Sequence, residues 1–151
     1  TKNEIKNIKL VLIMQTLDKK YFNEIKIYVE KYFHNNEIYF FENLNPIMLK
    51  KFYKNSLFYI FSSYCEVFGL TSLEAMKNKT PVLISKCSAM PEINGAAAMY
   101  FNPKSHMDIA NKMKILIRNT RLRKSLIKKG IKQSKKFKWF LTYKSLIKIL
   151  T

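Results

Sequence analysis

The chain has 151 residues, the length of one domain that can bury an apolar core, and 48% of them are hydrophobic. Its 28 Lys and Arg against 10 Asp and Glu give a formal net charge of +18, which favours partners that carry phosphate or other negative groups. No apolar run approaches the ~20 residues that span a bilayer, and the amino-terminal segment is polar, so we expect neither a transmembrane helix nor a signal peptide.

The cysteines indicate the redox environment of the protein, and the lysines show where its positive charge lies along the chain. Cys65 and Cys87 form no disulfide framework and show no metal-ligand spacing with His34 or His106. We therefore expect a reducing, cytoplasmic setting. Lysines are spread along most of the chain and are concentrated only from Lys112 to Lys148.

The spacing of apolar residues predicts strands that alternate with helices. In chain order we expect a strand over 8–14, a helix over 21–33, a strand over 37–41, a helix over 47–54, a strand over 57–61, a helix over 71–78, strands over 81–85 and 98–101, and helical structure from 106 onward. Asn45 as N-cap and Pro46 in the first helical position predict the start of the second helix. The last stretch is expected to break near Thr120, Gly130 and the pair Phe137 and Trp139.

Strands that alternate with helices require a parallel sheet with right-handed crossovers. We therefore predict an open, doubly wound α/β domain that covers residues 1–151. Ligands of such sheets bind beyond the carboxyl ends of the strands, and the turn after Phe61 opens there.

That turn carries two carboxylates around a glycine. Glu66 precedes Gly69, and Glu74 follows about one turn into the next predicted helix. The backbone N–H groups between them lie at a helix N-terminus, which favours a bound anion. Two acceptors for sugar hydroxyls beside a phosphate site indicate that a nucleotide-sugar binds here.

The stretch Glu66–Met76 resembles E-G-F-G-L-P-x-L-E-A-M, the hallmark of the carboxyl-terminal domain of group 1 (family 4) retaining glycosyltransferases with the GT-B fold. Five further phrases match the family in order: Tyr53–Ser56, Thr80–Leu83, Pro91–Ile93, Met99–Pro103 and Phe137–Trp139. The resemblance covers about residues 9–150. It implies the donor-binding domain of an enzyme that transfers sugar from a UDP- or GDP-sugar to a glycan or lipid-linked acceptor in surface polysaccharide synthesis.

The resemblance also implies residue roles. Glu74 would bind the ribose hydroxyls, and Glu66 would face the transferred sugar and act in catalysis. The N–H groups that would meet the diphosphate belong to Phe68, Gly69, Leu70 and Thr71. Leu44 would contact the nucleobase through its backbone, although core packing is the better single explanation for it. Taken alone, Glu74 is typical of an exposed glutamate in the first turn of a helix. The motifs that match the family in the same order favour a role for it in the nucleotide-sugar site instead.

Two departures from the family pattern carry structural expectations. Lys79 replaces a frequent Gly, so Asn78 or Lys79 is expected to take a left-handed conformation. Glu42 replaces a frequent Gly before the nucleobase loop. The family's phosphate-binding Arg and Lys, its acceptor-binding amino-terminal domain and its catalytic His have no counterpart in these residues. We therefore expect a fragment that is inactive alone and that needs no metal, since cations and a helix end meet the phosphate charge.

Two other interpretations stay open. The net charge alone is compatible with a basic, non-catalytic module that binds nucleic acid or an anionic surface. Residues 118–138 are expected to form an amphipathic helix, and its lysine-rich face is either solvated or in peripheral contact with a membrane. A response to UDP or GDP, rather than salt-dependent binding of nucleic acid, would favour the glycosyltransferase interpretation.

Overall fold

The computed structural model describes residues 8–15, 17–33 and 37–150. His34 therefore lies outside the described residues. The chain forms two compact units, residues 1–49 and residues 50–151, which we call the first unit and the second unit. The prediction that residues 1–151 form one nucleotide-sugar-binding domain stays a prediction.

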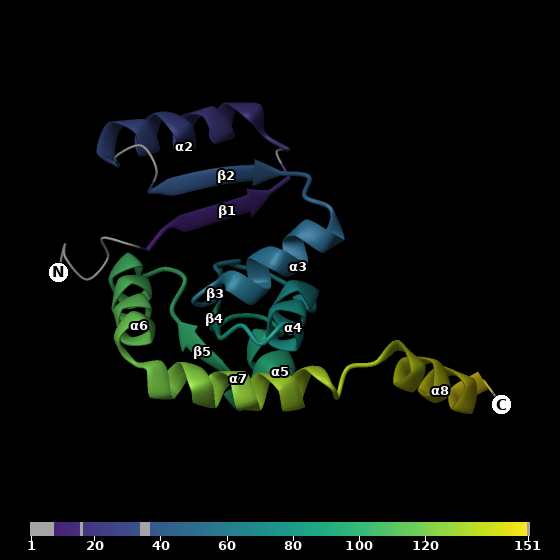
Figure 1. The fold of residues 1–151 in the computed structure, drawn as a ribbon. Helices are drawn as coiled ribbons and strands as arrows, with labels where there is room; N and C mark the ends of the chain where they lie inside the picture. Colours follow the sequence, from purple (N-terminus) through teal and green to yellow (C-terminus); the bar gives the residue numbers. More distant parts are fainter. Residues whose placement is uncertain (1–7, 16, 34–36, 151) are drawn as a thin grey trace. The chain divides into compact units, whose positions relative to one another are not determined.

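The first unit is a two-stranded parallel sheet with one helix. Strand β1 (Leu10–Met14) pairs with β2 (Ile38–Glu42), and helix α2 (Lys19–Tyr32) connects them (Figure 1). The ring of Phe22 on α2 meets that of Phe40 on β2 edge-on at 5.7 Å, so α2 packs on this sheet. All three elements lie within about two residues of the predicted ranges.

Helix α3 (Pro46–Asn55) begins in the first unit and ends in the second. The side chain of Asn45 accepts a hydrogen bond from the N–H of Met48 at 2.9 Å, so the predicted N-cap is confirmed. Its last turn carries Tyr53, which is buried.

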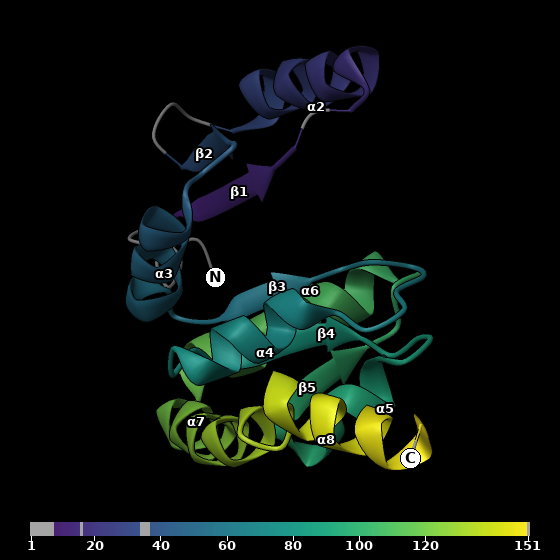
Figure 2. The same cartoon turned by 90° about the vertical axis from the view of Figure 1, so that its right-hand side faces the viewer.

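The second unit is built on a three-stranded parallel sheet in the order β3-β4-β5. These strands are β3 (Tyr59–Phe61), β4 (Val82–Ser85) and β5 (Ala98–Phe101). The helices are α4 (Leu70–Lys77), α5 (Met90–Asn94), α6 (His106–Arg118), α7 (Thr120–Ser134) and α8 (Trp139–Leu150), with a 3-10 turn, η1 (Gly95–Ala97), before β5. Helices α4 and α6 lie on opposite faces of this sheet (Figures 1 and 2), as a doubly wound α/β fold requires.

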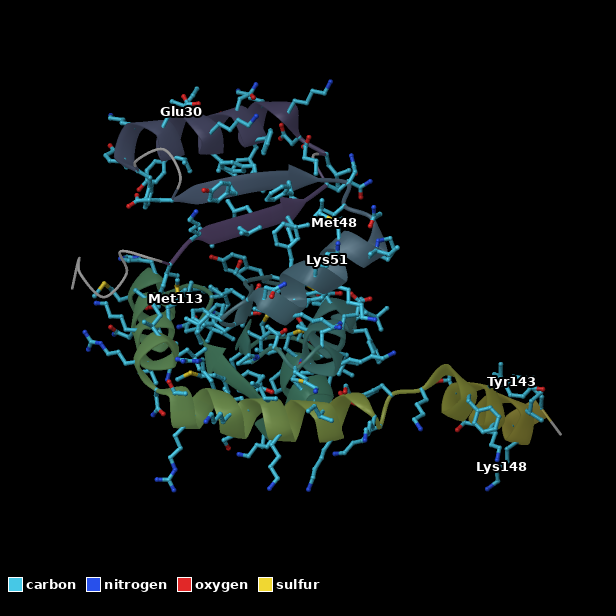
Figure 3. All side chains as sticks on the ribbon, viewed as in Figure 1. Glu30, Met48, Lys51, Met113, Tyr143 and Lys148 are labelled. Atoms are coloured by element: carbon cyan, nitrogen blue, oxygen red, sulfur yellow. The ribbon has the colours of Figure 1, made fainter. Side chains whose placement is uncertain are left out.

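The core of the second unit lies between its sheet, α6 and α7. Four buried side chains form its centre, and Met113 of α6 packs against them (Figure 3). They are Leu83, Phe101, Leu116 and Leu126. Every residue of β4 is buried because this strand is central, which explains its continuous apolar run.

Three local expectations are tested by the second unit. Asn119 caps α7 by accepting from the N–H of Leu122 at 2.8 Å, so the break near Thr120 is confirmed. The expected break near Gly130 is wrong, since α7 continues through it. A Cβ on Gly130 would lie 3.0 Å from Cγ of Met76, so the glycine lets α7 pack closely on α4. Lys79 takes the left-handed conformation, with φ of 64°.

Candidate functional site

The turn between β3 and α4 depends on Gly69. This residue is the N-cap of α4 with φ of 72° and ψ of 48°, a left-handed conformation. A Cβ here would lie 2.7 Å from Cε of the buried Met90. The carbonyl of Gly69 accepts from the N–H of Ser72 at 3.0 Å and from its hydroxyl at 2.8 Å. Backbone conformation and packing therefore both require glycine at this position.

Side chains at the end of β4 and just after it, and a backbone carbonyl in the loop after β5, hold the first part of this turn. The carbonyl of Ser63 accepts from Oγ of Ser85 at 2.6 Å and from Sγ of Cys87 at 3.1 Å. The hydroxyl of Tyr64 donates to the carbonyl of Pro103 at 3.1 Å. The segment that precedes Glu66 is thus tied to the sheet at several points.

The second part of the turn packs against the segment between α7 and α8. The rings of Phe68 and Phe137 meet edge-on, with centroids 5.6 Å apart. Phe137 belongs to the Phe137–Trp139 phrase that resembles the family pattern. This contact gives the phrase a structural role, because it fixes the residue next to Gly69.

The first turn of α4 presents backbone donors. Within the described part of the chain, no hydrogen bond uses the N–H groups of Phe68, Gly69, Leu70 or Thr71. Unpaired N–H groups at a helix start, together with the helix dipole, favour a bound anion. These are the donors predicted to meet the diphosphate, and that role stays a prediction.

The two glutamates lie on either side of these donors. Glu66 is half-buried, and its Oε1 accepts from the N–H of Val67 at 3.2 Å. Its Cγ would lie 3.5 Å from a Cβ on Gly69. Glu74 is exposed, one turn into α4. After burial, the negative charges of Glu74 and Glu66 help to raise the pKa of Tyr59.

Two tyrosines, Tyr53 and Tyr59, adjoin the candidate site, and their spacing in the sequence marks them only as core residues. The hydroxyl of Tyr59 donates to Oγ1 of Thr71 at 3.0 Å. Burial, and more weakly the charges of Glu74 and Glu66, raise the pKa of Tyr59 to about 12 against the opposing effect of the Thr71 hydrogen bond. Burial, then the neighbouring Tyr59, then the charge of Glu74 and a hydrogen bond to its carboxylate raise the pKa of Tyr53.

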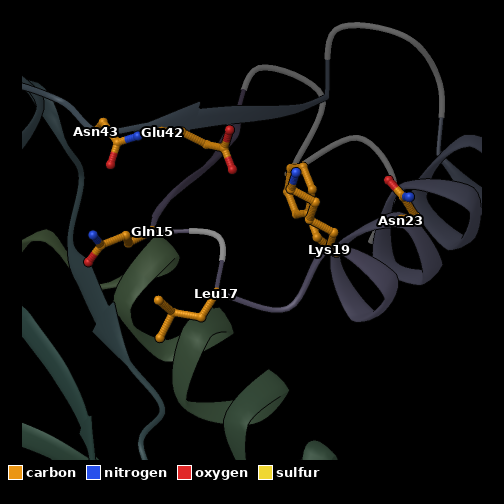
Figure 4. Close-up of a pocket in the computed structure, with 7 residues that line it drawn as sticks. Gln15, Leu17, Lys19, Asn23, Glu42 and Asn43 are labelled. Carbon is orange, nitrogen blue, oxygen red and sulfur yellow. The ribbon is translucent and has the colours of Figure 1, made fainter.

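Leu44 lies apart from this group in the chain. It is half-buried in the loop after β2 and belongs to the first unit, whereas every other predicted site residue belongs to the second. The first unit also holds a pocket of about 440 Å³, lined by residues that include Gln15, Lys19, Glu42 and Asn43 (Figure 4). None of the predicted site residues lines that pocket.

The part of the chain that the structure describes shows neither a metal-binding cluster nor a membrane-spanning helix. No group of three or more His, Cys, Asp or Glu side chains there could hold a metal ion. No helix there is long and apolar enough to cross a membrane.

Comparison with known proteins identifies the family. Residues 1–133 match the model of glycosyl transferases group 1, so the chain belongs to this family. It is 34% identical over 76 residues to the serotype-specific mannosyltransferase WbdA of Escherichia coli, covering 50% of this chain and 9% of that protein. It is 30% identical over 81 residues to the O-antigen chain mannosyltransferase B of Escherichia coli, covering 54% of this chain and 21% of that protein. The chain thus spans a small part of these relatives.

Solved structures give the same fold. The carboxyl-terminal domain of the group 1 glycosyl transferase LpcC from Francisella tularensis is 25% identical, with a TM-score of 0.75, and the match covers 89% of this chain and 73% of that one. Anabaena Alr3699/HepE in complex with UDP-glucose is 16% identical, with a TM-score of 0.85, and the match covers 98% of this chain and 43% of that one. The predicted α/β fold and GT-B resemblance are confirmed. The alternative of a nucleic-acid or anionic-surface module is not favoured.

Proposed function

We propose that this chain is the donor-binding part of a retaining glycosyltransferase that takes a UDP- or GDP-sugar. The observation that carries the proposal is the turn itself, in which Glu66 and Glu74 lie on either side of the unpaired N–H groups around Gly69. A diphosphate is complementary to those donors, and two carboxylates are complementary to the hydroxyls at its two ends.

Each carboxylate has a distinct role in this proposal. Glu74, one turn into α4, accepts hydrogen bonds from the two ribose hydroxyls. Glu66 accepts from hydroxyls of the transferred sugar and lies where positive charge develops at the anomeric carbon, so its negative charge stabilises the transition state. The leaving diphosphate gains negative charge, which the N–H groups at the start of α4 stabilise without a metal ion.

The acceptor is proposed from the relatives. WbdA and the O-antigen chain mannosyltransferase B act, by their names, in serotype and O-antigen synthesis. We therefore propose a glycan or lipid-linked acceptor of surface polysaccharide synthesis, a cytoplasmic enzyme and peripheral contact with the membrane that holds the acceptor. A partner domain that binds the acceptor would complete the cleft.

The proposed role of Glu66 can be tested by comparing the affinity of the chain for a sugar-nucleotide with its affinity for the free nucleotide. The unchanged chain is expected to bind UDP-glucose or GDP-mannose about tenfold more tightly than the matching nucleotide, because Glu66 accepts hydrogen bonds from the sugar. Glu66→Ala should remove that difference and leave the affinity for the free nucleotide unchanged, as measured by titration calorimetry. If Glu66→Ala preferred the sugar-nucleotide as strongly as the unchanged chain does, Glu66 would not be the residue that binds the sugar.

A further inference from the structure

The end of helix α7 reaches the candidate turn. This helix packs on α4 and continues into the short segment before α8 (Figure 1). It ends at Ser134, and the N–H of Lys136 donates to the carbonyl of Gln133 at 3.0 Å just beyond that end. Phe137 follows directly and is half-buried, with its ring against that of Phe68. The end of α7 therefore sets the position of Phe137.

Contacts with two other helices anchor this end of α7. Nε2 of Gln133 donates to the carbonyl of Ile93 on α5 at 2.6 Å. One turn earlier, Gly130 approaches α4 so closely that a Cβ on it would lie 3.0 Å from Cγ of Met76. Because α7 is held on both α4 and α5, it gives Phe137 a fixed support.

The contact between the two rings matters because of where Phe68 lies. Its side chain is 37% exposed, and its ring meets that of Phe137 at 89° with centroids 5.6 Å apart. Such an edge-on pair is attractive, and it removes rotamer freedom that an exposed phenylalanine otherwise keeps. The backbone N–H of Phe68 is the first of the four donors predicted to meet the diphosphate.

The next donor, the N–H of Gly69, is supported through α5. The space beside Cα of Gly69 is filled by Met90 of α5, whose Cε would lie 2.7 Å from a Cβ there. The hydrogen bond from Gln133 holds the same helix to α7. Two consecutive donors of the turn are thus backed by α7, Phe68 through Phe137 and Gly69 through α5.

We propose that Phe137 is a positioning residue for the donor nucleotide. Its ring holds Phe68 in the conformation in which the N–H groups of Phe68 and Gly69 point at the diphosphate. This inference rests on the proposed function. Phe137 itself touches no phosphate; it lowers the conformational entropy that the turn loses when the nucleotide binds.

The first test removes the ring of Phe137. Phe137→Ala is expected to weaken UDP or GDP binding about three- to tenfold, the effect of losing one aromatic pair and the order that it imposes. Phe140→Ala is the matched control, because this ring, three residues later, is 60% exposed and lies 4.9 Å from Nζ of Lys144 on its own helix. It should bind nucleotide like the unchanged chain. Titration calorimetry measures the affinities, and thermal unfolding of each variant reports stability separately.

A double-variant cycle separates positioning from a general structural role. Phe68→Ala removes the same ring contact from the other side and should weaken nucleotide binding by a similar factor. In that background Phe137→Ala should change the affinity by less than twofold, because its partner is already absent. A further three- to tenfold loss there would overturn the inference, as would equal affinities in Phe137→Ala and Phe140→Ala.

A measurement without nucleotide keeps the inference distinct from the proposed function. In the nucleotide-free chain the ¹⁵N order parameters of the Phe68 and Gly69 amides should fall in Phe137→Ala and stay unchanged in Phe140→Ala. Unchanged order parameters in Phe137→Ala would overturn the inference alone. If the unchanged chain binds neither UDP nor GDP, the proposed function is overturned and the inference with it.

Discussion

Replacing Gly69 by alanine is expected to destabilise the second unit by about 2–5 kcal/mol. The left-handed conformation at φ of 72° costs a residue with a Cβ about 1–2 kcal/mol. The new Cβ would lie 2.7 Å from Cε and 2.9 Å from Sδ of Met90, and such overpacking costs about 1–3 kcal/mol. The midpoint of urea unfolding, followed by circular dichroism, measures the loss.

A second substitution separates the two causes. Met90→Ala removes the side chain that the new Cβ would meet, while the backbone strain at Gly69 remains. Gly69→Ala combined with Met90→Ala should therefore lose less stability than the sum of the two single variants. Strict additivity would show that the contact with Met90 contributes nothing and that the turn tolerates a Cβ better than its geometry indicates.

Glu74→Ala is expected to lower the affinity for UDP or GDP by about 2–3 kcal/mol, or roughly 30- to 150-fold. A hydrogen bond to a charged group contributes about 1.5–3 kcal/mol, and the ribose offers two adjacent hydroxyls. Titration calorimetry on the unchanged chain and the variant measures the difference. Glu92→Ala, which removes another exposed helical glutamate, should leave the affinity unchanged.

The nucleotide can be varied as well as the protein. The unchanged chain should bind a 2′-deoxynucleoside diphosphate more weakly than the ribonucleotide, because one hydrogen bond to Glu74 is lost. Glu74→Ala should bind both with nearly equal affinity. If the variant kept the full preference for the ribonucleotide, Glu74 would not be the residue that binds the ribose.

Local signals in the sequence were sufficient for most elements. The run Ala98–Phe101 is a strand with the predicted bounds, and Asn45 caps α3 as its side chain and the following proline predict. Glu66 and Glu74 could be placed on either side of a helix start because they are close in sequence. Their position needs only a strand, a turn and a helix.

Features that depend on tertiary packing could not be predicted in this way. Helix α5 has five residues, too few to show a helical period. Gly130 signals a helix end unless the approach of Met76 is known. The hydroxyl of Tyr59 has its partner, Thr71, on α4, whereas apolar spacing alone places this tyrosine in the core. This buried contact was therefore missed, whereas the candidate residues of the turn could be named from the sequence, and their roles stay predictions.

We propose above all that a nucleoside diphosphate binds at the start of α4. The most direct measurement is a titration of the ¹⁵N-labelled chain with UDP and with GDP, followed by the backbone amide shifts. We expect one nucleotide to shift the amides of Phe68, Gly69, Leu70 and Thr71 most strongly, and Glu74→Ala to suppress these shifts. Shifts confined to the lysine-rich helices, equal for both nucleotides and removed by salt, would contradict it.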